Sequence, residues 1–102
     1  MAIGKTPVAV TRALRELGQQ LTTWRKLRQL TAAEVADRAG IGVATVHRLE
    51  AGEGVTMENL LRVARALGVL DALVSALDPY TTDVGRLRAD EALPERVRGR
   101  RR

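Results

Sequence analysis

The chain has 102 residues, enough for one domain with one modest core, and 45% of them are hydrophobic. It contains no cysteine, which excludes disulfides and thiolate metal sites, and no apolar run long enough for a signal peptide or a membrane span. The net charge of +5 is uneven, with +5 on residues 1–30, −3 on residues 31–78 and +3 on residues 79–102. We therefore expect a cytoplasmic protein without membrane contact, whose basic flanks suit a polyanionic partner.

The N-terminal part predicts a flexible leader followed by a long helix. Residues 1–7 contain a glycine and a proline and show no periodicity, so we expect them to be mobile. From Val8 onward, apolar residues recur three and four positions apart, which predicts a helix that ends before Thr31. Gly18 interrupts this pattern at a cost of about 1 kcal/mol relative to alanine, which allows a bend or a late start of the helix there. The outer face is basic and would either meet a phosphate backbone or face solvent: Arg12, Arg15, Lys26 and Arg28.

Residues 30–52 predict two short helices joined by a tight turn. The first runs from about Thr31 to Arg38, and Thr31 with Glu34 matches the S/T-x-x-E capping box. Gly40 suits the positive φ of the turn, and Gly42 stands at the N-cap of a second helix over about residues 43–51. The apolar spacing assigns seven residues to the inner faces of the pair: Leu30, Val35, Ala36, Ala39, Ile41, Val46 and Leu49.

This pair of helices is typical of the helix-turn-helix, whose second helix lies in the DNA major groove. An ordinary αα-hairpin with a solvated outer face is the alternative that the pattern leaves open. In either case the outer face of the second helix carries Val43, Ala44, His47 and Arg48.

Two further helices are predicted before the basic C-terminal tail. Thr56 caps a helix that ends before Gly68 and closes the core with one face: Leu60, Val63, Ala64 and Leu67. Residues 70–77 form an almost wholly apolar helix, which would either dimerise or pack onto the first helix. Pro79 ends the folded part, and residues 79–102 form a basic tail that is partly disordered unless bound. Within the tail, residues 84–93 would form at most a turn or two of marginal helix. Three roles remain open for the tail: it would contact DNA, fold against a protein partner, or only increase the solubility of the protein.

The residues that catalysis or metal binding would need are scarce. His47 is the only histidine, and no nucleophile motif, P-loop, dinucleotide-binding glycine pattern or metal-ligand spacing occurs. We therefore expect no enzyme activity, no cofactor and no metal site.

The segment LTAAEVADRAGIGVATVHRLEAG, followed by LLRVARALGV, resembles the lambda-repressor/Cro/XRE-type helix-turn-helix domain over about Leu14 to Leu77. The resemblance implies an all-α, five-helix DNA-binding domain over residues 8–78, between the leader and the tail, which binds double-stranded operator DNA as a homodimer. It also implies an ion pair between Arg25 and Glu50, which would fix geometry more than it stabilises.

The resemblance also implies the DNA contacts. These fall on the second helix, and we add two residues that precede it, which gives a predicted set of seven: Val43, Ala44, Thr45, His47, Arg48, Thr31 and Arg28. Arg48 would read guanine through O6 and N7, and Val43 or Ala44 would touch a thymine methyl group. Thr45 would meet phosphate or cap the helix locally. Two positions depart from the family pattern. Ala32 stands where many members have glutamine, and the second helix opens with the apolar residues Val43 and Ala44 instead of polar base readers.

The C-terminal stretch LDALVSALDPYTTDVGRLRADEALPERVR is similar to the HipB-like regulators that are encoded beside HipA-family kinase toxins. This likeness implies a DNA-binding repressor that regulates its own operon and also holds a HipA-like kinase toxin, as the antitoxin of the pair. Two alternatives remain open: a protein-interaction module whose DNA reading is vestigial, and a basic, non-specific nucleoid-type binder.

Overall fold

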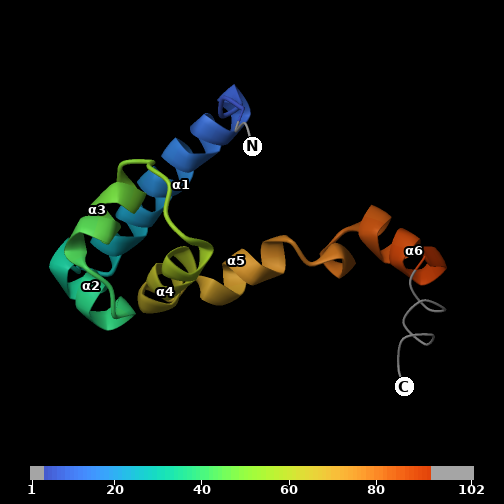
Figure 1. The fold of residues 1–102 in the computed structure, drawn as a ribbon. Coiled ribbons are helices and arrows are strands. Elements are labelled where there is room, and N and C mark those ends of the chain that lie inside the picture. The colour runs from blue at the N-terminus through green and yellow to red at the C-terminus, as the bar shows by residue number, and fades with distance from the viewer. Residues whose placement is uncertain (1–3, 93–102) are drawn as a thin grey trace, which may run out of the picture. The chain divides into compact units, whose positions relative to one another are not determined.

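Helices account for all the regular secondary structure in the part of the chain that the structure describes. A computed structural model describes residues 4–92, and no strand occurs among them. The predicted all-α fold is thus confirmed. The chain divides into two units, Met1–Leu70 and Asp71–Arg102, which are described separately below (Figure 1).

The N-terminal unit contains four helices: α1 (Val8–Leu27), α2 (Ala32–Ala39), α3 (Val43–Glu50) and α4 (Met57–Leu67). Helix α2 packs against both α3 and α4, and α1 also packs against α3 and α4 (Figure 1). The first turns of α1 extend beyond the other three helices. The helix-turn-helix is therefore α2 and α3, with α1 and α4 as its supports.

Local hydrogen bonds begin and end these helices as the sequence predicts. The Glu34 amide donates to Thr31 Oγ1 at 3.1 Å, and the Thr31 amide donates back to Glu34 Oε1 at 2.9 Å, so the capping box of α2 is complete. The amide of Asn59 donates to Thr56 Oγ1 at 3.1 Å at the start of α4. Gly40 ends α2 with φ 71°, a left-handed conformation in which a Cβ would be strained.

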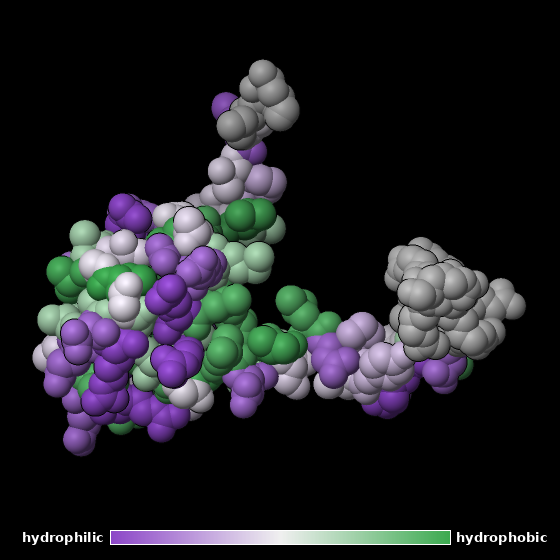
Figure 2. Space-filling view, turned by 60° about the horizontal axis from the view of Figure 1, so that its bottom comes forward, coloured by the Kyte–Doolittle hydropathy of each residue, from purple (hydrophilic) through white to green (hydrophobic). Residues whose placement is uncertain are grey.

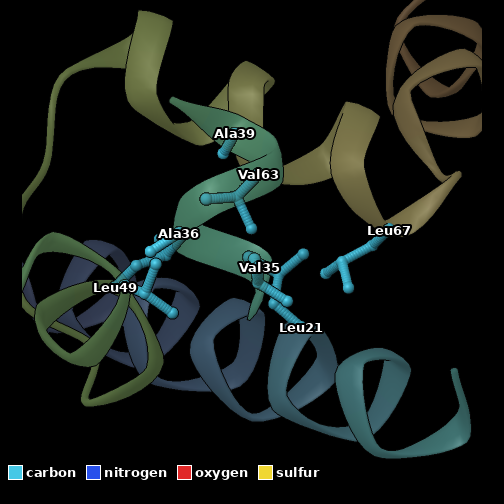
Figure 3. Close-up of a cluster of buried hydrophobic side chains, with 8 residues drawn as sticks. Leu21, Val35, Ala36, Ala39, Leu49, Val63 and Leu67 are labelled. Carbon is cyan, nitrogen blue, oxygen red and sulfur yellow. The ribbon is translucent and has the colours of Figure 1, made fainter. Parts of the chain in front are cut away.

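One apolar core lies among the four helices of this unit. Figure 3 shows its side chains converging from α1, α2, α3 and α4, and the buried members are Leu21, Val35, Ala36, Ala39, Val46, Leu49, Val63 and Leu67. All five inner-face residues predicted on α2 and α3 are among them. Leu30 and Ile41, which flank those helices, are partly buried against the core.

The apolar stripe of α1 is only partly used by this core. Leu21 is the one large apolar residue of α1 that is buried, while others on the same stripe stay exposed, among them Val10, Leu17 and Trp24. The reason is that α3 and α4 cover one edge of the helix. Helix α1 begins at Val8 and continues through Gly18, so the late start that the sequence allowed at Gly18 does not occur.

The C-terminal unit is more regular than the sequence predicts. Helix α5 (Leu70–Ala76) begins at the boundary, and it is followed by the single 3₁₀ turn η1 (Pro79–Thr81) and the ten-residue helix α6 (Asp83–Ala92). The sequence allowed at most a marginal turn or two in place of α6. A hydroxyl cap supports α6, because Thr82 Oγ1 accepts from the Gly85 amide at 2.9 Å, and Asp78 caps η1 by accepting from the Tyr80 amide at 3.0 Å.

This unit has almost no buried apolar surface of its own. No residue of α5 is buried, and Ala89 is the one buried apolar residue described after Leu70. Figure 2 shows apolar surface along α5, and the exposed large apolar side chains of this unit are Val74, Leu77, Tyr80, Val84 and Leu87. The arginine-rich end of the predicted tail, residues 93–102, and the start of the predicted leader, residues 1–3, lie outside the described residues.

Candidate nucleic-acid interface

Helix α3 divides its residues between the core and solvent. Val46 and Leu49 point inward and are only 1% and 5% exposed. Thr45 is half-buried, whereas the remaining predicted readers are exposed on the opposite face: Val43, Ala44, His47 and Arg48. The structure therefore brings five of the seven predicted DNA contacts together on one short helix.

The C-terminal end of α3 is held by a close backbone approach to α1. A Cβ atom on Gly18 would lie 2.6 Å from the Leu49 carbonyl oxygen and 2.7 Å from the Glu50 carbonyl oxygen, which is too close for any side chain. Gly52, just after α3, repeats the arrangement, since its Cβ would lie 2.9 Å from the Cα of Arg15. The contact partners of these glycines are far away in the sequence, so the sequence analysis missed this role.

An ion pair joins the same two helices. Arg25 Nε donates to Glu50 Oε2 at 2.6 Å and Arg25 Nη2 donates to Glu50 Oε1 at 3.2 Å, which is the pair that the resemblance implies. Arg25 Nη1 also donates to the Leu30 carbonyl oxygen at 3.0 Å, so one guanidinium links α1, α3 and the α1–α2 loop. The side chains are only 17% and 15% exposed. The hydrogen bond to the Glu50 carboxylate raises the pKa of Arg25 above its ordinary value.

The other two predicted DNA contacts, Arg28 and Thr31, precede α3 and have partners within the fold. Arg28 Nε donates to the Leu67 carbonyl oxygen at the end of α4, at 3.0 Å, and its guanidinium lies 5.2 Å from the centre of the Trp24 ring. A cation at a helix C-terminus is favourable, so Arg28 supports α4. Thr31 uses its hydroxyl in the capping box of α2.

The described residues provide no arrangement typical of catalysis. No group of three or more potential metal ligands occurs among residues 4–92. A separate finding is that none of the helices in this range is long and apolar enough to cross a membrane. A cavity of about 520 Å³ opens beside the end of α2 and along α4. Its polar lining consists of arginines and carboxylates without a histidine or hydroxyl side chain: Asp37, Arg38, Glu58, Arg62 and Arg65.

Comparisons with known proteins agree with this geometry. A family model described as a helix-turn-helix domain matches residues 16–77, from within α1 to just past α5. The cryptic phage CTXphi transcriptional repressor RstR of Vibrio cholerae serotype O1 is 38% identical to this chain over 55 residues, which are 53% of this chain. The match spans 49%, about half, of the length of that relative. No solved structure matches the chain.

Proposed function

The chain belongs to the XRE-type helix-turn-helix family, and on that premise we propose that it is a sequence-specific, DNA-binding transcriptional repressor. The observation that carries the proposal is the exposed face of α3. This helix is held by backbone contact and by an ion pair, while Val43, Ala44, His47 and Arg48 are left free for a ligand. A rigid helix with free outward side chains is what insertion into the major groove requires.

The polar members of the predicted set have distinct roles in the proposed complex. Arg48 donates to guanine O6 and N7, while His47 and Thr45 contact bases or phosphate. Thr31 and Arg28 would meet phosphates at the edge of the groove. For Arg28, this contact would have to use the N–H groups that its bond to the Leu67 carbonyl leaves free.

We propose that the protein binds double-stranded operator DNA as a homodimer in the cytoplasm, by binding alone, without catalysis, cofactor or metal. A dimer of this kind would read half-sites about 34–36 Å apart, one turn of the double helix.

Replacing Arg48 tests the proposal. A random duplex library enriched by the wild-type protein should yield one half-site, and Arg48→Ala should lose about 1–3 kcal/mol of binding and relax the preference at one base pair. Fluorescence anisotropy and sequencing of the enriched library measure both effects. Arg65→Ala removes the same charge from an exposed position on α4 and should leave the base preference unchanged. An identical site profile for Arg48→Ala and wild type would remove Arg48 from the readers.

The exposed apolar surface of the C-terminal unit supports a second candidate function. In this function the protein is an antitoxin that holds a HipA-like kinase toxin through α5 and α6. Leu77 is 85% exposed, and the other large apolar side chains of the unit are exposed with it. An apolar surface of this kind is typical of a protein contact. The same surface is also available to a second copy of the chain.

Co-purification with the product of the neighbouring open reading frame tests the antitoxin role. Leu77→Asp should reduce the recovered partner at least several-fold, because burial of a carboxylate in an apolar contact is costly. Val8→Asp places the same charge on an exposed apolar position of the other unit and serves as the control. If Leu77→Asp lowers only the protein's own oligomeric mass, the surface is a homodimer contact and does not hold the toxin. If no partner co-purifies with the wild type, the antitoxin role is wrong.

A further inference from the structure

We infer that the first turn of α3 recognises the methyl group on C5 of a pyrimidine, so that operator binding distinguishes thymine and 5-methylcytosine from unmethylated cytosine. The inference rests on the proposed function, because it specifies the DNA that the same helix reads. It follows from the side chains at the leading end of α3 and from the chemistry of the major groove.

The exposed side chains at the leading end of α3 are those of Val43 and Ala44, and neither can hydrogen-bond to a base. Gly42 is the N-cap and contributes no side chain, and a Cβ there would meet nothing within 4 Å, so the end is open. Val43 is 41% exposed and Ala44 is exposed as well. The first turn contains no acidic residue, and Thr45 is half-buried. The exposed side chains at this end are therefore apolar, and its polar groups are the backbone amides and the half-buried Thr45 hydroxyl.

Among the base edges of the major groove, the thymine C5-methyl group is the apolar feature. The polar features are oxygen, nitrogen and amino groups, with which Val43 or Ala44 cannot pair, and the ring C–H of cytosine at the same position is much smaller than a methyl group. Apolar atoms that cover a polar edge leave it without its water, which costs binding energy. The first turn of α3 therefore selects a methyl group, and 5-methylcytosine presents the same methyl at the same ring position.

The polar readers follow one turn later on the same face. His47 lies four residues after Val43, and Arg48 lies four residues after Ala44. Four residues of helix rise by about 6 Å, which corresponds to roughly two base-pair steps of about 3.4 Å. We therefore place the methyl-bearing pyrimidine within about two steps of the guanine that Arg48 reads.

Single-atom changes in DNA test this inference directly. The probe is the duplex that the protein enriches from a random library, with each thymine replaced in turn by deoxyuridine, which lacks only the methyl. At one or two positions the dissociation constant should rise about fourfold, the change expected for exposing one methyl-sized group. Cytosine at that position should bind about fourfold more tightly when it carries a 5-methyl group.

Protein variants connect this effect to α3. Val43→Ser and Ala44→Gly remove the apolar atoms, and at least one of them should bind the thymine and deoxyuridine duplexes equally. Val74→Ser makes the same change at an exposed position of α5 and should keep the wild-type difference. Helical circular dichroism spectra and melting curves confirm that each variant is folded.

The outcomes separate the inference from the proposed function. Failure to enrich any sequence from the library would overturn sequence-specific reading itself. Enrichment of a site at which every deoxyuridine is neutral would overturn only the methyl-reading inference. Full methyl sensitivity in both Val43→Ser and Ala44→Gly would overturn it as well, because the methyl would then be read by other residues.

Discussion

Gly18 sets the distance between α1 and α3 through its lack of a side chain. Alanine has the higher helix propensity by about 1 kcal/mol, so propensity alone predicts that Gly18→Ala stabilises the protein. Its Cβ would instead lie 2.6 Å from the Leu49 carbonyl oxygen, and that atom belongs to the backbone and cannot rotate away. We expect Gly18→Ala to lower the free energy of unfolding by about 1–3 kcal/mol, measured by urea denaturation.

Gly54 provides the matched control for that experiment. A Cβ on Gly54 would meet nothing within 4 Å, and its φ is not positive, so Gly54→Ala should change stability by no more than about 0.5 kcal/mol. Equal stability of Gly18→Ala and the wild type would mean that α1 shifts freely along α3, and the backbone contact would then not position α3.

The role of Gly18 could not be predicted from the sequence alone. A glycine inside a helical pattern indicates either a bend or a close approach, and the two meanings differ only in what lies opposite. The atoms opposite Gly18 belong to Leu49 and Glu50, whose position depends on the whole fold. The same reason applies to Arg28, because its acceptor, the Leu67 carbonyl oxygen, comes near it only after folding.

At the scale of elements, the capping box of α2 makes stability depend on acid. The Glu34 carboxylate is hydrogen-bonded by the backbone amide of Thr31 and by the Thr31 side chain. These two bonds lower the pKa of Glu34 below its ordinary value of 4.5. The unfolded chain binds that proton more readily than the folded one, so this stabilisation is complete above about pH 4.5 and is lost as the pH falls further. We expect Glu34→Gln to reduce the acid sensitivity of the urea midpoint between about pH 5 and pH 3.

Glu53→Gln is the control for the cap, because Glu53 is exposed and its carboxylate makes no hydrogen bond in the described structure. It should retain the acid sensitivity of the wild type. If Glu34→Gln and the wild type respond identically to acid, the capping carboxylate contributes nothing to the folded state.

Elements with strong local signals were predictable from the sequence. Helices α2 and α4 begin at threonine caps and end at left-handed glycines, and the inward residues between them follow the helical period. Helix α6 was not predictable, because Val84 and Leu87 stay exposed and give no core-facing pattern. For α3, the pattern assigned the outward face, while its rigid attachment to α1 depends on contacts that are distant in sequence.

At the scale of the whole molecule, stability is concentrated in one of the two units. Every member of the main core lies between Leu21 and Leu67, within the unit Met1–Leu70. We expect a variant that lacks residues 71–102 to unfold cooperatively, with a urea midpoint close to that of the full chain. Circular dichroism at increasing urea concentration measures this, and a non-cooperative transition would show that the C-terminal unit completes the core.

The attachment of α3 has a practical consequence. The glycine contact and the Arg25–Glu50 pair that orient this helix involve none of Val43, Ala44, His47 and Arg48. These four side chains can therefore be exchanged without disturbing the contacts that orient α3. A library randomised only there would be a compact platform for retargeting to new operators.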